Sequence, residues 1–186
     1  MKLARRFFVG FALVGALAVL GWFSLPKPPL LDRISFSRRV YDRNGKLLCL
    51  TLSDDEKYRI FTPLERISPE LIRATLAQED RFFGKHVGVN PIALTRAAWH
   101  YSLGHSGRGG ASTITMQLAR IRFHLNSRTV AGKCTQIFRA LELERHYTKS
   151  QLLEAYLNLA PYGGNIEGIG AASEIYFRKN PRKLTL

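Results

Sequence analysis

The sequence predicts a mainly α-helical domain with a small N-terminal β element, preceded by one transmembrane helix. Three observations support this prediction. Nineteen residues without a charge, Phe7 to Leu25, follow the basic tip MKLARR. A stretch around Asn44-Gly45 places apolar residues on both sides of a turn dipeptide, which is typical of a β-hairpin. From Ser68 onward, apolar residues recur at helical spacing behind capping residues.

The uncharged run is long enough to cross a membrane. As a helix it measures roughly 28 Å at about 1.5 Å per residue, close to the ~30 Å hydrocarbon core. The cations before it keep the N-terminus in the cytoplasm and send the rest of the chain across. A cleaved signal peptide is the alternative, because Ala16-Leu17-Ala18 imitates a cleavage site. The apolar run continues to Trp22 and Phe23, so we favour an uncleaved signal anchor over residues 1–25.

Composition restricts the kind of partner. The 186 residues include 28 Lys and Arg against 14 Asp and Glu, which gives a formal net charge of +14. Such an excess suits nucleic acid, acidic lipid headgroups or a phosphorylated substrate. A basic domain outside the cytoplasm argues against nucleic acid.

The two cysteines give little information. Cys49 and Cys134 are compatible with a disulfide in an oxidising compartment, but they form no spacing pattern. Cys134 shares a helical stripe with Val130, Ile137 and Leu141, so we expect a buried free thiol. The sequence contains no C-x-x-C or H-E-x-x-H metal motif.

The elements follow in order behind the anchor. SLPKPPL marks a Pro-rich linker over residues 26–37, which should be stiff and extended. The domain, residues 38–186, begins with the hairpin RRVYDRNGKLLCLTL and a short strand in KYRIF. Capping and turn signals then predict the following order: helices from Ser68-Pro69, from Asn90-Pro91 to Gly104, from Ser112 to about Leu125, from about Thr129 to Tyr147, and from the capping box of Thr148 and Gln151 through Asn158, then a turn in APYGGN and a last helix from about Glu167 to Phe177. The ending Leu184-Thr185-Leu186 looks like the entry to a further element, so we expect a truncated domain.

Two acids stand side by side in the stretch TLAQEDRFFGKHVG. From Ser68-Pro69 onward, Ile72, Leu76 and Phe83 fall on one stripe at helical spacing, Glu79 lies in the same stripe, and Asp80 points about 100° away. A buried, unpaired carboxylate holds its proton more tightly, which suits a general acid or base. The alternative is that Glu79 lies at the edge of the stripe and pairs with a nearby base: Arg81, Lys85 or His86. The periodicity alone leaves both interpretations open.

A glycine-rich loop, GHSGRGGAS, precedes the helix expected at Ser112. Gly107, Gly109 and Gly110 let the backbone approach a ligand, and the free N–H groups of a helix start favour an anion. The Gly-Lys-Ser/Thr of a Walker A loop is absent. Alone the loop indicates little, because glycine-rich loops before a capping serine usually only connect elements.

Three motifs together resemble a known family. EDRFFGKHVG resembles the E-D-x-x-F-x-x-H-x-G motif of glycosyltransferase family 51, the peptidoglycan glycosyltransferases of class A penicillin-binding proteins. GGASTITMQLAR resembles that family's G-x-S-T-x-T-x-Q motif, and KSQLLEAYLNLAPYGGNIEGIGAAS resembles its K-x-x-x-L-E-x-Y-L-N motif. The motifs occur in the family's order, and the hairpin and the anchor agree with it.

A fourth motif departs from the family pattern. Where the family has R-K-x-x-E, this chain has GKCTQ, so Gly132 replaces Arg, Lys133 is kept and Gln136 replaces Glu. Together with Met116 in TITMQ and the APYGG turn, this is most similar to the 1C subgroup of these proteins. The family glutamate is thought to help place the donor diphosphate or a metal, and Gln136 can do so only through hydrogen bonds.

The resemblance implies a lysozyme-like fold with a membrane-associated groove, located in the periplasm and anchored in the inner membrane. The implied substrate is lipid II: the growing glycan on its lipid diphosphate is the donor, and the GlcNAc 4-hydroxyl of lipid II is the acceptor. The α-linked donor yields a β-1,4 bond, so the reaction inverts. Glu79 is then the general base, Lys133 is the first candidate to neutralise the leaving diphosphate, and a divalent cation such as Mg or Mn assists.

Other motif residues are candidates for binding or support. A structural role is the stronger interpretation for Phe83 and Tyr156 in the core, and for Asp80 and His86 in local hydrogen bonds. The candidates for the substrate or diphosphate site, besides Lys133, are Ser112, Thr113, Gln117, Arg120, Arg128, Gln136, Lys149 and Asn158. Of these, Gln117 and Asn158 either contact substrate or satisfy buried backbone, and Glu154 is expected to pair with Lys149.

The resemblance also implies cell-wall synthesis proteins as partners. Two other classes of function stay open. Lysozyme-like folds also include lytic enzymes, which use a glutamate to donate a proton to the glycan. The basic loop and the anchor favour a lipid-diphosphate substrate over a neutral chain. A scaffold that lost catalysis through Gln136 is the second alternative, and the retained Glu79 and Lys133 argue against it.

Overall fold

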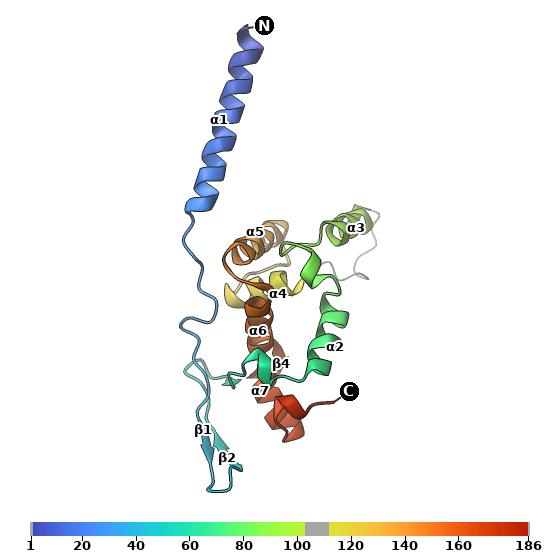
Figure 1. Ribbon diagram of the computed structural model, residues 1–186. Helices are drawn as coiled ribbons and strands as arrows, with labels where there is room; N and C mark the ends of the chain where they lie inside the picture. The colour runs from blue at the N-terminus through green and yellow to red at the C-terminus, as the bar shows by residue number, and fades with distance from the viewer. Residues whose placement is uncertain (1, 103–111, 186) are drawn as a thin grey trace.

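The computed structural model describes residues 2–102 and 112–185. A long N-terminal helix, α1 (Lys2–Ser24), leads into an extended segment that runs beside the rest of the chain to a β-hairpin (Figure 1). The later elements form a helical body, with α3 (Pro91–Ser102) and α5 (Val130–His146) at one end and α7 (Ile169–Ala172) towards the other. The predicted mainly α architecture with a small β element is confirmed.

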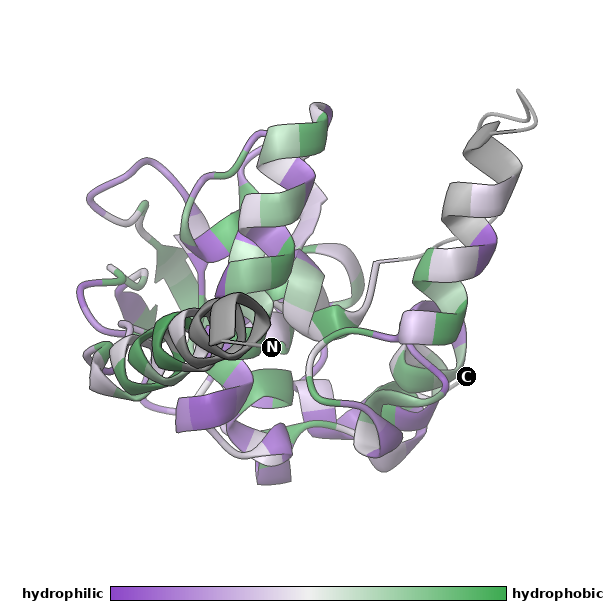
Figure 2. Cartoon of the chain, turned by 90° about the horizontal axis from the view of Figure 1, so that it is seen from above, coloured by the Kyte–Doolittle hydropathy of each residue, from purple (hydrophilic) through white to green (hydrophobic). Residues whose placement is uncertain are grey.

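Most of helix α1 stands away from the body, and only the C-terminal end of α1 contacts it. The Trp22 ring packs edge-on against Phe138 of α5 (Val130–His146), with 5.1 Å between the ring centroids. The views from the front and from above place α1 and α3 (Pro91–Ser102) on opposite sides, and apolar residues are present along α1 (Figure 2). Within the part of the chain that the structure describes, no helix is both long and apolar enough to cross a membrane.

The linker is extended through Pro29, but it turns at residues 31–34, where the N–H of Ile34 donates to the Leu31 carbonyl. Backbone carbonyl oxygens of Leu25 and of the linker accept hydrogen bonds from side chains of α4 (Ile114–Arg122), α5 and the residue after α5. The pairs, at 2.6 to 2.8 Å, are Arg145 with Leu25, Tyr147 with Pro28, and Arg122 with both Leu30 and Asp32. The linker therefore packs as part of the domain.

The predicted hairpin is present. Strands β1 (Arg39–Tyr41) and β2 (Leu47–Leu50) pair antiparallel. The Asp42 Oδ1 oxygen accepts the backbone N–H groups of Asn44 and Lys46, both at 2.8 Å, and closes the turn. Gly45 has a φ of 79°, a conformation that glycine adopts without cost, so the Asn-Gly dipeptide predicted the turn correctly.

A second, three-stranded sheet joins distant parts of the chain. The strand predicted in KYRIF is present as β3 (Tyr58–Arg59), which pairs in parallel with β5 (Ile166–Glu167). Strand β5 also pairs antiparallel with β4 (Pro161–Gly163). The APYGGN segment, predicted as a turn alone, therefore contains a strand as well. Gly163 and Gly164 supply the reversal with φ angles of 120° and 53°, and the remote strand β3 supplies a pairing partner.

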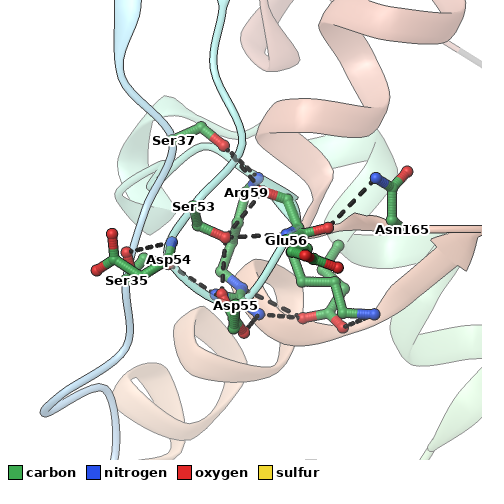
Figure 3. Close-up of polar contacts among 10 residues, drawn as sticks. Ser35, Ser37, Ser53, Asp54, Asp55, Glu56, Arg59 and Asn165 are labelled. Carbon is green, nitrogen blue, oxygen red and sulfur yellow. Dashed lines mark hydrogen bonds and ion pairs between the residues drawn. The ribbon is translucent and has the colours of Figure 1, made fainter.

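A buried arginine holds this sheet to the end of the linker (Figure 3). The Arg59 side chain donates to the Ser35 carbonyl at 2.6 Å, to Asp55 at 3.0 and 3.2 Å, and to Glu167 of β5. The hydrogen bonds from Arg59 lower the pKa of Asp55 to about 2. Because a buried guanidinium is costly unless paired, these partners make the junction specific.

The hydrophobic core lies around α4 (Ile114–Arg122), which packs against α5 and α6 (Lys149–Leu159). Short apolar side chains from all three helices interdigitate there and exclude water. The fully buried members are Ile114, Met116, Leu118, Ala119, Ala140, Leu143, Leu152, Ala155 and Leu157. This core fixes the three helices that carry half of the predicted site residues: Gln117, Arg120, Lys133, Gln136, Lys149, Glu154 and Asn158.

Helix starts follow the capping signals. The Thr129 side chain caps α5, and Thr148 with Gln151 forms the predicted capping box of α6. Helix α3 opens at Pro91 behind Asn90, whose Oδ1 accepts the N–H of Ala93 at 3.1 Å. The capping box, the long α5 and the start of α3 are confirmed.

Several boundaries differ from the prediction. Helix α4 begins at Ile114, because Thr113 rather than Ser112 caps it, and it ends at Arg122. Ser68 precedes α2 (Pro69–Glu79) as predicted, but its hydroxyl donates to the Glu70 carboxylate at 2.8 Å. The last helix is α7 (Ile169–Ala172) followed by a π-helical turn over Ser173–Phe177, and single 3-10 turns are Leu64–Arg66, Phe83–Lys85 and Pro181–Lys183. Gly104 lies outside the described residues.

Candidate functional site

The two acids at the end of α2 lie opposite to the prediction. Glu79 is exposed, whereas Asp80 is buried, with 7% of its surface accessible. The reason is that α2 ends at Glu79: Asp80 has φ −159° and ψ 76°, so the chain leaves the helix there. Phe83 lies on the next 3-10 turn, and the helical stripe cannot be extended to it. Of the two interpretations left open for Glu79, the buried one is therefore wrong.

Asp80 joins the first motif to the second. Both of its carboxylate oxygens lie 3.0 Å from His86 Nε2, and Oδ2 also accepts the backbone N–H of Ile114 at 3.1 Å. Ile114 is the first residue of α4, and a carboxylate is favourable at a helix N-terminus. The predicted local hydrogen-bonding roles of Asp80 and His86 are confirmed.

The Glu79 carboxylate is held by a side chain of α4. Gln117 Nε2 donates to Glu79 Oε2 at 2.7 Å, and Gln117 Oε1 accepts the Tyr156 hydroxyl at 3.3 Å. Burial raises the pKa of Tyr156 to about 12, and the charge of Glu79 adds to this effect. The same two causes raise the pKa of Tyr162 to about 12. Among the described residues, Glu79 has no ion pair with any of the bases proposed for it: Arg81, Lys85 and His86.

A cavity of about 480 Å³ opens beside the two acids. Glu79 and Asp80 line it, together with Ser112 from the residues before α4. Four basic residues also line it: Arg81, Lys85, His86 and Arg96. The cavity therefore presents one exposed carboxylate near several basic side chains, within a lining that is mostly apolar.

Lys133 lies next to this cavity. Its Nζ donates to Ser112 Oγ at 2.8 Å and to Gln136 Oε1 at 3.0 Å. Burial lowers the pKa of Lys133, and the charge of Arg120 lowers it further. The structure thus brings four of the predicted diphosphate-site residues together. Arg128 is exposed in the loop between α4 and α5, and Gly107, Arg108, Gly109 and Gly110 lie outside the described residues.

Gln136 and Gly132 explain the departure from the family motif. Gln136 is buried, with 1% of its surface accessible, and its Nε2 donates to the Met116 carbonyl at 2.6 Å. A Cβ atom at Gly132 would lie 1.8 Å from the Asn126 carbonyl oxygen, so the loop before α5 leaves no room for a side chain. Gly132 therefore permits a close contact between this loop and the first turn of α5.

Two other candidates use their polar groups inside the protein. The buried Thr113 hydroxyl donates to the Gly88 carbonyl at 2.5 Å and accepts the N–H of Met116. The fully buried Asn158 side chain accepts the N–H of Thr62 at 2.7 Å and donates to the Thr62 carbonyl at 2.9 Å. Of the two roles considered for Asn158, the structure thus shows hydrogen bonding to buried backbone groups. Contact of Thr113 or Asn158 with substrate stays a prediction.

Lys149 has a different partner from the one predicted. Its Nζ donates to Glu144 Oε1 at 2.7 Å and to the His86 carbonyl at 2.6 Å, and it lies over the Phe83 ring. Glu154 instead accepts the backbone N–H of Leu64 at 2.8 Å, so the predicted Lys149–Glu154 pair is wrong. Lys149 therefore joins the start of α6 to Glu144 of α5 and to His86 of the first motif.

Both cysteines are free and exposed, so the predicted burial of Cys134 is wrong. The buried face of α5 contains Gln136 and Ala140, and Cys134 lies about 200° around the helix from Gln136. Phe83 and Tyr156 are in the core as predicted.

The described residues contain no group of three or more His, Cys, Asp or Glu side chains that is suited to a metal ion. Around Lys133 the donors are an ammonium, a guanidinium, a hydroxyl and an amide, and no carboxylate is among the contacts of these groups. Divalent magnesium prefers oxygen ligands that include carboxylates, so this set does not fit a cation held by the protein alone.

Comparisons with known proteins agree on one family. A family model described as "Transglycosylase" matches residues 45–186. Penicillin-binding protein 1C of Escherichia coli (strain K12) is 40% identical over 158 residues, which cover 85% of this chain and 20% of that protein. Penicillin-binding protein 1A of the same organism is 36% identical over 181 residues, covering 94% and 21%. Penicillin-binding protein 4 of Bacillus subtilis (strain 168) is 35% identical over 147 residues, covering 79% and 23%. The chain thus spans about a fifth of the length of these relatives.

Proposed function

Because the chain belongs to the transglycosylase family, we propose that it is a peptidoglycan glycosyltransferase that polymerises lipid II into glycan strands. The GlcNAc 4-hydroxyl of lipid II attacks the α-linked sugar of the growing strand and displaces the lipid diphosphate, with inversion to a β-1,4 bond. One observation carries the proposal. Glu79 presents an exposed carboxylate at a cavity whose wall includes Ser112, the hydrogen-bond partner of Lys133.

Glu79 acts as the general base. Its carboxylate accepts the proton of the attacking hydroxyl as the new glycosidic bond forms. The hydrogen bond from Gln117 Nε2 at 2.7 Å holds this carboxylate at the cavity. A lytic enzyme needs the same group as a proton donor, but the cations Lys133 and Arg120 favour a lipid-diphosphate substrate over a neutral glycan chain.

The leaving diphosphate is neutralised by the group around Lys133. An ammonium has three N–H donors, and Ser112 and Gln136 occupy two of them. The third donor has no partner among residues 2–102 and 112–185 and is available to a phosphate oxygen. The Ser112 hydroxyl proton is available in the same way, because its oxygen already accepts from Lys133. Arg120 adds a second positive charge near the position where the leaving-group charge develops. The donor set around Lys133 does not fit a divalent cation held by the protein alone, so the charge of the leaving group is met by Lys133 and Arg120.

A lipid-linked substrate requires a position at the membrane. The sequence alone supports a single anchor in the inner membrane with the domain in the periplasm, because three cations precede the uncharged run from Phe7 to Leu25. Lipid II, the growing strand and cell-wall synthesis proteins are the partners of this proposal. Protease added to spheroplasts should digest the chain beyond Pro26, and a domain that survives while a periplasmic control is cut contradicts the topology.

The activity is tested with purified full-length protein, lipid II and gel-resolved glycan products. Glu79→Gln preserves shape and removes the base, so it should abolish polymerisation without a change in melting temperature. Glu65→Gln, a matched change at an exposed acid of the Leu64–Arg66 turn, should polymerise like the wild type. Shortening of preformed strands would instead indicate a lytic enzyme, and folded wild type without either activity would indicate a scaffold. Polymerisation by well-folded Glu79→Gln would contradict the general-base role.

A further inference from the structure

Three side chains from three helices form one hydrogen-bonded series. Tyr156 of α6 donates to Gln117 of α4 at 3.3 Å, and Gln117 donates to Glu79 at the end of α2 at 2.7 Å. Glu79 is exposed, Gln117 is half-buried and Tyr156 is buried. The series therefore begins in the core and ends at the cavity.

The chemistry of the three groups permits one direction of donation while Glu79 is ionised. A carboxylate only accepts hydrogen bonds, so the amide must present its nitrogen to Glu79. The amide oxygen then faces Tyr156, and the hydroxyl must donate to it. If the amide turned over, its oxygen would face the carboxylate and its nitrogen would face the hydroxyl, and the hydrogen bond to Glu79 would be lost.

Tyr156 is suited to the role of a permanent donor. Burial and the nearby charge of Glu79 raise its pKa to about 12, so the hydroxyl keeps its proton throughout the neutral range. Its ring is fixed in the core, with 7% of its surface accessible. Tyr162 experiences the same two influences, but its hydroxyl has no hydrogen bond among the described residues.

We propose that Gln117 is a positioning residue that holds the Glu79 carboxylate at the cavity, and that Tyr156 fixes the orientation of the Gln117 amide. This inference rests on the proposed function, since it assigns the two residues to the general base rather than to substrate. Glu79 ends a helix and lies at the surface, where an unrestrained side chain samples several rotamers. Holding it in one of them places the base where the attacking hydroxyl arrives.

The test uses purified full-length protein and steady-state polymerisation of lipid II. Tyr156→Phe should lower kcat about fivefold, as expected for loss of one neutral hydrogen bond, and leave KM unchanged. Gln117→Leu removes a hydrogen bond to a charged group and should lower kcat roughly tenfold or more, again at constant KM. In the Gln117→Leu background, Tyr156→Phe should cause no further loss, because the two residues act in series. Tyr162→Phe is the matched control and should retain wild-type kcat.

Distinct outcomes separate the inference from the proposed function. Folded wild type that does not polymerise lipid II overturns both. If the wild type is active, two results contradict the Tyr156–Gln117–Glu79 series and leave the proposed function intact. One is an unchanged kcat in Tyr156→Phe; the other is a double variant in which the fold-losses in kcat of the two single variants multiply. A raised KM in Gln117→Leu assigns Gln117 to substrate and also overturns it. If Tyr156→Phe does not fold, Gln117→Asn decides: the amide is retained one methylene short, and kcat should fall while KM stays constant.

Discussion

Asp80 Oδ2 accepts the backbone N–H of Ile114 at 3.1 Å, which ties the end of α2 to the first residue of α4. The same carboxylate binds His86 Nε2, so one buried acid connects three segments. Glu79 precedes Asp80, and its partner Gln117 lies one turn along α4 from Ile114. The fixed Asp80 therefore sets the position from which Glu79 reaches Gln117.

Replacing Asp80 should destabilise the fold to an extent that depends on the substitute. Asp80→Ala leaves the Ile114 N–H and His86 Nε2 buried without a partner, and we expect a loss of about 1–3 kcal/mol per unpaired group. Asp80→Asn should lose less, because its oxygen can accept from Ile114 and its nitrogen can donate to the other tautomer of His86. Urea unfolding of both variants measures this. Asp54→Ala, at an exposed acid, is the control, and equal stabilities of Asp80→Ala and wild type would contradict the role.

The Arg59 network predicts a dependence of stability on pH. The pKa of Asp55 is lowered to about 2 in the folded protein, against 3.8 ordinarily, chiefly by its hydrogen bonds with Arg59. A depressed carboxyl pKa stabilises the fold above the unfolded value, and that contribution is lost as pH falls through the folded value. Because 54% of the Asp55 side chain is exposed, we expect at most about 1 kcal/mol after screening.

The measurement is the free energy of unfolding between pH 5 and about 2. Asp55→Asn should flatten the part of this profile that arises from Asp55 and leave the other acids unaffected. A profile that is identical in wild type and Asp55→Asn would contradict the assignment of the shift to this network.

Lys133 should be needed for turnover and not for folding. Lys133→Ala removes the cation that donates to Ser112, and we expect a loss of about 10²–10³ in kcat, as for other groups that stabilise developing charge. Stability should change little, because burial already disfavours the charge that is removed. Lipid II polymerisation and melting curves test both statements. Lys179→Ala, an exposed cation near the C-terminus, controls for the reduced net charge; an equal loss there would indicate a general electrostatic effect.

Local signals in the sequence predicted most of the fold. Thr129, the Thr148–Gln151 box and Asn44-Gly45 act through neighbours in the chain, so their chemistry is readable without tertiary structure. The end of α2 was not predictable in this way. No glycine or proline follows Glu79 directly, and the helix stops because Asp80 turns inward to His86 and Ile114. The orientation of both acids follows from that contact between remote segments.

The sequence predicted which residues belong to the candidate site better than it predicted how their side chains pair. The motifs indicated Lys133, Ser112, Gln136 and Arg120, and the structure brings them together. The pairing of Gln117 with Tyr156 was missed, since the aromatic in the Y-L-N motif was interpreted as core only. Its hydroxyl was the available signal, because a buried tyrosine usually finds a hydrogen-bond partner.

Gly132 should tolerate no side chain, although the family has arginine at this position. A Cβ atom there would lie 1.8 Å from the Asn126 carbonyl oxygen and 3.0 Å from Thr129 Oγ1, which caps α5. Gly132→Ala must therefore move the backbone of the loop or break the cap, and we expect a loss of about 2 kcal/mol or more. Gly84→Ala is the matched control, because a Cβ atom at Gly84 would meet nothing within 4 Å. Urea unfolding should separate the two variants, and polymerisation should fall in Gly132→Ala, since displacement of the start of α5 moves Lys133. Equal stability and activity in both variants would show that the loop yields easily, and that the glycine is not required by the close contact.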